Sequence, residues 1–349
     1  MSYTDTDQYQ QEIAAQYKMR VVKFPKHKVA EAIGKLGFEL AEDDLKEARV
    51  GNVNATYIAP KIVVKVSRDR DEVNYLANKI VSEKLVTRQP VMKVLAYDYF
   101  EKTDFEILVM ERVSGTLLLD DIFDVSKEDL TKLFRQVVSV VNAAFTITFA
   151  DFGWVNNTQQ HFKTYSEFIS HDFKNHVATI RTDKLCREEE ISRVEKYFLG
   201  HVHIFDHERP VFIHTDLHMG NILHVGDELT AILDWDYSLR APKMAVLESL
   251  LGFINNPQQF VEGTEDFPKY QGKKFSFLLP ILREELSEVF ADPLLVQKLN
   301  LRFIGSGIMW IADNWSEEWN KEMMANIIAH EIPEDEEGLK ESYYGKILK

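Results

Sequence analysis

The sequence contains very little cysteine and no long apolar run. Cys186 is the only cysteine in 349 residues, which excludes an internal disulfide framework and indicates a reducing compartment. The longest uncharged stretch, residues 136–150, is too short to cross a bilayer and contains Asn142 and Thr148. Residues 1–12 are polar and show no apolar segment of a secretory signal. We therefore expect a cytoplasmic protein with no membrane segment.

Basic residues are also scarce relative to acidic ones. Lysine and arginine number 41 against 56 aspartate and glutamate residues, which gives a net charge of -15. A nucleic-acid partner needs a basic surface, so this balance argues against one. The charge is compatible with a cationic substrate, but many cytoplasmic proteins are acidic. The apolar and charged fractions, 45% and 28%, are those of an ordinary soluble globular protein.

The pattern of the sequence changes near Gly115. Before it, apolar runs predict strands at residues 55–59, 62–66, 94–99 and 105–110, with one helix carrying Val73, Leu76, Ala77, Ile80 and Val81 on one face. After it, predicted helices occupy residues 126–141, 166–179, 188–199, 244–254, 276–290 and 293–328. We expect an α+β fold with a β-rich N-terminal lobe (residues 1–113), a helical lobe (residues 114–349), and ligands bound between them.

Residues 214–221 form the most informative motif, H-x-D-x-x-x-x-N. In a kinase catalytic loop of this spacing, the Asp accepts a proton from a hydroxyl nucleophile and the Asn binds a metal. Here those residues are Asp216 and Asn221, and a predicted hairpin then returns the chain to Asp234. Asn221 and Asp234 could thus share one ion, and their oxygen ligands suit magnesium. The alternative is an ordinary turn before an ordinary hairpin.

The N-terminal lobe offers residues for holding phosphates. A turn between two predicted strands carries Gly51 and Asn54, where backbone N–H groups could cover a triphosphate. Lys65 lies within an apolar strand, and a buried lysine facing phosphates needs a carboxylate partner. Glu72 is the first candidate for that partner and Glu83 the second. Each feature also has a plain structural explanation: a hairpin turn, a solvated edge lysine, or a glutamate favoured by a helix dipole.

The strand that ends at the lobe boundary is a candidate adenine site. Adenine needs an apolar slot together with one backbone acceptor and one backbone donor. Met110 could line the slot, while the backbones of Glu111 and Val113 could supply the two hydrogen bonds before Gly115. The same segment could equally be a plain strand end.

Two other patterns compete for a functional role. Asp151 begins a D-F-G triplet, but it precedes the catalytic loop, so we assign the metal role to the later D-W-D segment at Asp234. His201, His203 and His207 could suggest a zinc hydrolase, yet their alternation with apolar residues favours a strand or loop.

Together these residues resemble the aminoglycoside phosphotransferase-like family, the small-molecule branch of the protein-kinase-like fold. The resemblance covers about residues 48–248 and rests chiefly on residues 211–221 and 232–236. It implies a bilobal fold, ATP and Mg²⁺ as cofactors, and phosphorylation of a hydroxyl on an aminoglycoside-like antibiotic or related metabolite. It also implies Asp216 as catalytic base, Asn221 and Asp234 as magnesium ligands, and Asp236 as an aid to a second ion or the acceptor.

The acceptor side departs from the family pattern. Val141-Asn142 replaces a Leu-His pair, and residues 239–243 lack the usual Asp of a Gly-Asp-Pro segment. The acceptor could therefore be an aminoglycoside, a macrolide, choline, an amino alcohol or a sugar derivative.

One hypothesis is that the acceptor is cationic and is bound by acidic side chains. The candidates are Asp236, Glu248, Asp313 and Glu317, with the last two expected four residues apart on one helix face and Trp310 a turn earlier. The alternative is a solvated acidic helix face. A different alternative for the whole chain is a nucleotide-binding pseudokinase with a regulatory role, although the joint presence of the phosphate-site residues argues against lost catalysis.

Overall fold

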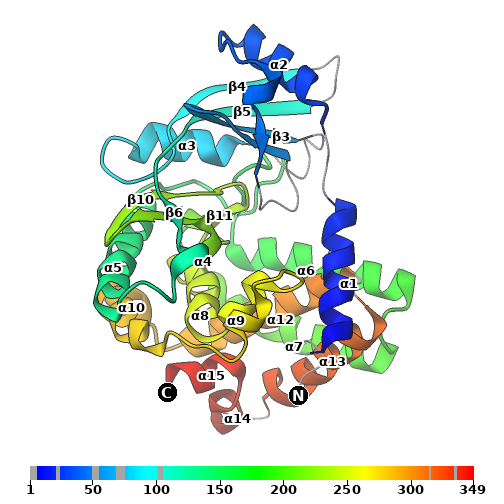
Figure 1. The fold of residues 1–349 in the computed structure, drawn as a ribbon. Helices are drawn as coiled ribbons and strands as arrows, with labels where there is room; N and C mark the ends of the chain where they lie inside the picture. The colour runs from blue at the N-terminus through cyan, green and yellow to red at the C-terminus, as the bar shows by residue number, and fades with distance from the viewer. Residues whose placement is uncertain are drawn as a thin grey trace.

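The structure is a computed structural model, and it describes residues 6–20, 24–48, 55–67, 75–100, 105–313, 316–333 and 336–349. Figure 1 shows a smaller, sheet-containing lobe above a larger helical lobe. The smaller lobe has an antiparallel sheet in the order β1-β2-β3-β5-β4. Its strands are β1 (Lys46–Glu47), β2 (Ala55–Ile58), β3 (Ile62–Ser67), β4 (Val94–Phe100) and β5 (Phe105–Glu111). The α+β prediction and the expected strands are therefore confirmed.

Strand β5 has buried side chains on both faces of this sheet. Its side chains are buried from Phe105 to Met110, and all of them except Glu106 are apolar, as expected of a strand covered on both faces. Ile107 and Val109 share a cluster with Val29 and Ile33 of helix α2 (Lys26–Lys35). Leu108 and Met110 belong to a second cluster, which includes Tyr75 at the start of helix α3 (Leu76–Leu85). The sheet thus lies between two apolar layers.

The helical lobe is built mainly from helices, and the start and apolar face predicted for one of them are observed. Ser126 caps α5 by accepting the N–H of Asp129, as expected. The helices are α4 (Leu118–Asp121), α5 (Lys127–Ala144), α6 (Tyr165–Asp183), α7 (Glu188–His201), α8 (Leu247–Asn255), α9 (Phe267–Tyr270), α10 (Leu279–Glu285), α11 (Ser287–Phe290), α12 (Leu295–Ala312), α13 (Glu317–Asn326), α14 (Glu336–Lys340) and α15 (Tyr343–Leu348). Short 3-10 turns include η3 (Val202–Phe205), η4 (Met219–Asn221), η5 (Lys243–Val246) and η6 (Pro257–Val261).

Two small sheets of this lobe contain the strands that flank the H-x-D-x-x-x-x-N motif and the D-W-D segment. One has the order β10-β9-β6 and the other β7-β11-β8. Their strands are β6 (Thr116–Leu117), β7 (Gly153–Trp154), β8 (Val211–His214), β9 (Ile222–Val225), β10 (Glu228–Ile232) and β11 (Ser238–Ala241). The β9–β10 pair is the hairpin expected after the H-x-D-x-x-x-x-N motif, and it is antiparallel.

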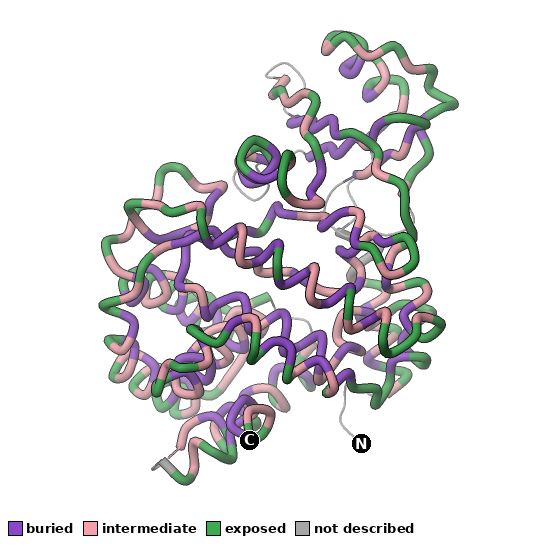
Figure 2. The backbone as a smooth tube through the Cα atoms, turned by 90° about the vertical axis from the view of Figure 1, so that its left-hand side faces the viewer, coloured by how far each residue is buried: buried purple, intermediate pink, exposed green. Residues whose placement is uncertain are grey.

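Two predicted helices are interrupted, and the prediction of single helices there is wrong. The segment 293–328 contains α12 and α13 as separate helices, because Ser316 caps a new helix by accepting the N–H of Trp319. The segment 276–290 divides into α10 and α11 at Leu286. Figure 2 shows the buried residues running through the interior of both lobes. Among the residues described, none of the helices has the length and apolar character needed to cross a membrane.

The first helix, α1 (Asp7–Arg20), lies beside the helical lobe (Figure 1). Tyr9 and Ile13 are buried in the core of that lobe, and the Tyr9 hydroxyl donates to Glu262 at 2.9 Å. The N–H of Gly263 donates to the Gln10 side chain at 2.6 Å. Phe24, a few residues later, is buried in the sheet lobe. By its contacts α1 therefore belongs with the helical lobe, whereas we had expected residues 1–113 to form the N-terminal lobe.

Gly263→Ala is expected to loosen α1. Gly263 has φ +72, and a Cβ there would lie 2.8 Å from the Ala14 backbone nitrogen. Gly272 has a similar φ of +68 but open space around its Cβ position, so Gly272→Ala is the matched control. Both variants incur about 1–2 kcal/mol of backbone strain, and Gly263→Ala should lose about 1–3 kcal/mol more from overpacking. Thermal unfolding of the two variants measures this difference; equal loss would show that the α1 contact contributes nothing.

Candidate active site

His214 organises the loop that joins β8 to β9. It is buried, its Nε2–H donates to the Leu233 carbonyl at 2.9 Å, and its Nδ1 accepts the N–H of Asp216 at 3.1 Å. Burial lowers the pKa of His214, so the ring is neutral near pH 7 and these bonds select one tautomer. The first residue of the motif therefore ties the loop to the strand end that precedes Asp234.

Asp216 is held on one side and open on the other. Asn221 Nδ2 donates to the Asp216 carbonyl at 2.7 Å and to its Oδ2 at 3.1 Å. His218 Nε2 lies 3.5 Å from Oδ1, and the Asp216 side chain remains 44% exposed. A carboxylate that is anchored yet accessible is suited to meet a hydroxyl group of a bound molecule.

The sequence did not single out His218 or its partner Phe260. His218 Nδ1 accepts the N–H of Gly220 at 3.0 Å, which leaves Nε2–H facing Asp216. The ring stacks on Phe260 of η6 with 4.4 Å between centroids and 10° between planes. The location of His218 inside the motif was a usable signal, whereas the contact with Phe260 depends on the tertiary fold.

The two ends of the hairpin meet, as its length predicted. The N–H of Leu233 donates to the Asn221 carbonyl at 2.8 Å, and Asp234 follows with a left-handed φ of 57. Because Asn221 Nδ2 bonds to Asp216, Oδ1 is the amide atom that could face an ion. The assignment of Asn221 and Asp234 as metal ligands remains a prediction.

Lys65 crosses from the sheet lobe to the D-W-D segment. Its Nζ lies 2.8 Å from Asp234 Oδ1 and 2.5 Å from Asp236 Oδ2. Lys65 and Asp236 are both buried, and Lys65 Nζ is 5.9 Å from the centre of the Tyr75 ring. The expected partner Glu72 lies outside the described residues, and the second candidate, Glu83, is exposed on α3. Among the described residues, the carboxylates that Lys65 contacts are thus the two aspartates of the D-W-D segment.

These buried charges shift one another's pKa. Burial opposes the charge on Lys65, but attraction to Asp234 and Asp236 outweighs it and raises the pKa of Lys65. Burial likewise disfavours ionised Asp234, yet Lys65 outweighs it and lowers the pKa of Asp234. Asp236 is also paired with Lys65, but burial and its neighbour Asp234 raise its pKa to about 6. Asn78 of α3, which the sequence reasoning missed, donates to Asp236 Oδ1 at 2.5 Å.

An apolar cluster adjoins these charges, because it includes Tyr75, whose ring faces Lys65. Met110 is buried with Leu108 and Met92, and Val63, Val113, Leu223 and Leu233 pack against that cluster. The cluster therefore combines residues of the sheet lobe with residues of the β9–β10 hairpin. The N–H of Glu111 donates to the Lys93 carbonyl at 2.9 Å. Gly51 and Asn54 lie outside the described residues.

The acidic residues proposed for the acceptor do not form one surface. Glu248 accepts hydrogen bonds from Arg302 Nε at 2.9 Å and Ser306 at 2.5 Å within the helical lobe. Asp313 follows the end of α12, whereas Glu317 begins α13 and pairs with Lys321 at 2.6 Å. The expectation that Asp313 and Glu317 share a helix face is wrong, because α12 ends at Ala312 and a separate helix, α13, begins at Glu317.

The D-F-G triplet and the histidine cluster, the two patterns that competed for a functional role, make local contacts. Asp151 pairs with Arg240 at 2.7 Å and with His161 at 2.6 Å. His201 ends α7 and His203 lies in η3, where we had expected a strand or loop. In the described part of the chain, no three His, Cys, Asp or Glu side chains are grouped as a metal site.

Asp172 on α6 gives a pH-dependent prediction. The Trp154 side chain hydrogen-bonds to it, but burial is the larger effect and raises the pKa of Asp172 to about 6. An unfolded Asp titrates near about 3.9, so ionised Asp172 lowers stability increasingly as pH rises from about 4 to about 6. Asp172→Asn, which keeps an acceptor for Trp154, should raise the melting temperature by a few degrees at pH 7.5 and by less at pH 4.5. Asp183→Asn, at the exposed end of α6, is the control and should show no such difference.

Comparisons with known proteins were made for the sequence and for the fold. A family model described as the phosphotransferase enzyme family matches residues 59–244, more than half of the chain. No curated protein sequence matches the chain significantly.

Several solved structures have a similar fold. The streptomycin–ATP–APH(2'')-IIa ternary complex has a TM-score of 0.62 and 12% identity, covering 88% of this chain and 97% of that chain. A thermostable mutant of aminoglycoside phosphotransferase APH(4)-Ia, with AMP-PNP and hygromycin B, has a TM-score of 0.59 and 14% identity, covering 85% and 98%. ADP-bound aminoglycoside phosphotransferase APH(2'')-Ib has a TM-score of 0.57 and 13% identity, covering 92% and 98%. At these identities the likeness concerns the two-lobed fold.

Proposed function

The chain belongs to the phosphotransferase enzyme family, and from this membership we propose that it is an ATP-dependent kinase that phosphorylates a hydroxyl of a small molecule. The observation that carries the proposal is the convergence of Asp216, Asn221, Asp234 and Lys65. Asp216 is anchored by Asn221, Asn221 is joined to the far end of the hairpin, and Asp234 there pairs with Lys65. Phosphoryl transfer needs such positioning and charge neutralisation more than it needs covalent chemistry.

Each of these residues has a distinct role in the proposal. Asp216 orients the acceptor hydroxyl and accepts its proton, because its carboxylate is anchored by Asn221, is accessible and is not paired with Lys65. Lys65, which belongs to the sheet lobe, neutralises the negative charge of the phosphate oxygens. Met110 and Val113 line the adenine slot, and the backbone of Glu111 and Val113 bonds the base. Gly51 and Asn54 cover the phosphates, and Glu72 remains a proposed partner of Lys65.

The residues at the hairpin ends fit a magnesium ion. Asp234 offers carboxylate oxygens and Asn221 an amide oxygen, the hard ligands that Mg²⁺ prefers alongside phosphate. When bound, Mg²⁺ would neutralise charge on the β- and γ-phosphates. The Leu233–Asn221 hydrogen bond supports the pairing, because it brings the two candidate ligands to the same end of the hairpin.

The acceptor is proposed to be an aminoglycoside-like antibiotic or a related hydroxylated metabolite. The structures with similar folds include complexes described with hygromycin B, streptomycin and kanamycin. A cationic acceptor agrees with the net charge of -15, but the shared helix face first expected to bind it does not exist.

The test is an ADP-release screen of the protein with Mg-ATP against aminoglycosides, macrolides, amino alcohols and sugars. Phosphorylated product, identified by mass spectrometry and lost in Asp216→Asn, is the expected result. Nucleotide binding without transfer to any acceptor would instead favour the regulatory pseudokinase. Absence of nucleotide binding would contradict both functions.

A further inference from the structure

Asp236 is contacted from three places in the fold. Lys65 of β3 and Asn78 of α3 bind its carboxylate at 2.5 Å each, on Oδ2 and Oδ1. Asn156, from the loop between β7 and α6, donates through Nδ2 to the Asp236 backbone carbonyl. Two of these partners belong to the sheet lobe and one to the helical lobe. Asp236 is therefore a point at which the lobes are joined.

Asn156 also contacts the sheet lobe directly. Its Oδ1 accepts the N–H of Ala77 at 2.9 Å, in the first turn of α3. The N–H groups of a first helical turn have no partner inside the helix, and Tyr75 at the N-cap position provides no side-chain cap. Ala77 is fully buried, so its N–H would remain unsatisfied without Asn156. A residue of the other lobe thus caps this helix.

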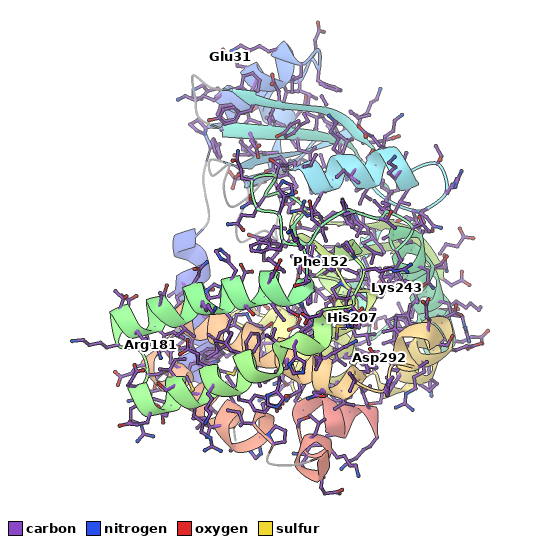
Figure 3. All side chains as sticks on the ribbon, turned by 180° about the vertical axis from the view of Figure 1, so that it is seen from behind. Glu31, Phe152, Arg181, His207, Lys243 and Asp292 are labelled. Carbon is purple, nitrogen blue, oxygen red and sulfur yellow. The ribbon has the colours of Figure 1, made fainter. Side chains whose placement is uncertain are left out.

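The loop that carries Asn156 is fixed to the helical lobe. Phe152 and Phe162 exchange backbone hydrogen bonds of 2.9 and 3.3 Å across its base. Arg240 Nη2 donates to the Gln160 carbonyl at 2.7 Å, and the N–H of Val155 donates to the Ser238 carbonyl at 3.0 Å. Figure 3 labels Phe152 in the upper part of the helical lobe, toward the sheet lobe. Asn156 therefore extends from a braced support.

We propose that Asn156 is a positioning residue that clamps α3 and Asp236 together, and so sets the position of Lys65 for phosphoryl transfer. The proposal rests on the proposed kinase function. Its basis is geometric: one amide group bonds the helix start with its oxygen and the Asp236 backbone with its nitrogen. Without that amide, α3 loses its cap, and Asn78 and Asp236 can shift relative to each other. Lys65 then loses the fixed carboxylate that orients its ammonium.

The test compares Asn156→Ala with Asn157→Ala. Asn157 is half-buried in the same loop, and its Oδ1 accepts the N–H groups of Gln159 and Gln160, which belong to that loop. Asn156→Ala should lower kcat/KM for ATP by about 5- to 30-fold relative to Asn157→Ala, as expected for a loss of about one or two kcal/mol. The acceptor KM should match that of the control, whereas the melting temperature of Asn156→Ala should be somewhat lower, because the buried Ala77 N–H loses its acceptor.

Hydrogen exchange tests the capping of α3 by Asn156 independently of the effect of Asn156 on kcat/KM. The Ala77 amide should exchange faster in Asn156→Ala and normally in Asn157→Ala. Asn156→Asp keeps an acceptor for Ala77 but loses the donor to Asp236, so it should retain protection of Ala77 while still lowering kcat/KM. If the wild-type protein transferred no phosphoryl group, the kinase proposal would fail, and the exchange rates would still decide whether the cap exists.

Two results would overturn the proposal. Equal exchange at Ala77 in Asn156→Ala and Asn157→Ala would mean that Asn156 does not cap α3. Faster exchange with unchanged kcat/KM for ATP would mean that the cap exists but does not position Lys65.

Discussion

Asp216→Asn is expected to lower phosphoryl-transfer turnover by about 10²- to 10⁴-fold, the usual contribution of a general base. The substitution preserves shape, and the new amide oxygen can still accept the hydrogen bond from Asn221 that holds Asp216 at 3.1 Å. What it removes is the ability to accept a proton from the acceptor hydroxyl. Because Asp216 is not one of the residues of the apolar cluster around Met110, where the proposal places the base, the nucleotide dissociation constant should change little.

Steady-state kinetics with an acceptor from the screen, combined with calorimetric ATP binding, measures both quantities. Asp227→Asn is the control, since Asp227 lies in the turn of the same hairpin and pairs only weakly with Lys132, at 3.3 Å on the surface. A turnover of Asp216→Asn close to that of Asp227→Asn would contradict the catalytic-loop assignment. A large loss of ATP affinity would instead indicate that Asp216 acts in nucleotide binding.

The conformation of residues 214–221 could be predicted because the contacts of this loop are local. Asp216 and Asn221 are five residues apart, and the hairpin returns Leu233 to Asn221 over a short stretch of chain. Motif spacing and turn chemistry therefore carry most of the geometry. The strand that contains Lys65 was predictable for a similar reason, since its apolar run is long enough to require burial.

The partners of Lys65 could not be predicted in the same way. The Lys65–Asp236 contact spans 171 positions, and the Asn78–Asp236 contact spans 158. Sequence reasoning favoured Glu72 because it lies nearby along the chain, and local proximity was the available criterion. Asn78 did carry a signal, because it is a polar residue on the buried face of α3 together with Ser82. A polar side chain on a buried face needs a partner, but the sequence does not say which.

The residues proposed to bind the acceptor show a case in which apolar periodicity predicts the wrong helix boundaries. Continuous apolar spacing across residues 293–328 suggested one helix, and the face shared by Asp313 and Glu317 followed from it. Ser316 followed by acidic residues is a helix start, and it overrides the apolar period. An acidic acceptor surface must therefore be sought by binding experiments on the identified acceptor.

Asp234→Ala is expected to abolish the magnesium dependence of ATP binding. Asp234 is the candidate metal ligand with a charge, and it also pairs with Lys65 at 2.8 Å. Loss of this carboxylate should lower the affinity for Mg-ATP by about 10²-fold, which corresponds to about 3 kcal/mol. Asn221→Ala should have the same effect more weakly, because a neutral amide oxygen contributes less than a carboxylate.

Asp234→Asn distinguishes the effect of losing the carboxylate charge from the effect of straining the backbone at this position. Asp234 adopts a left-handed φ of 57, which alanine tolerates poorly and asparagine tolerates well. If Asp234 binds the ion, Asp234→Asn should fold like the wild type and still lose most of the gain in ATP affinity that magnesium provides. Calorimetric titration with ATP, with and without MgCl₂, measures that gain in all three variants. Retention of the full gain in Asp234→Asn would remove Asp234 from the metal site, whereas loss in Asp234→Ala alone would assign its effect to the backbone.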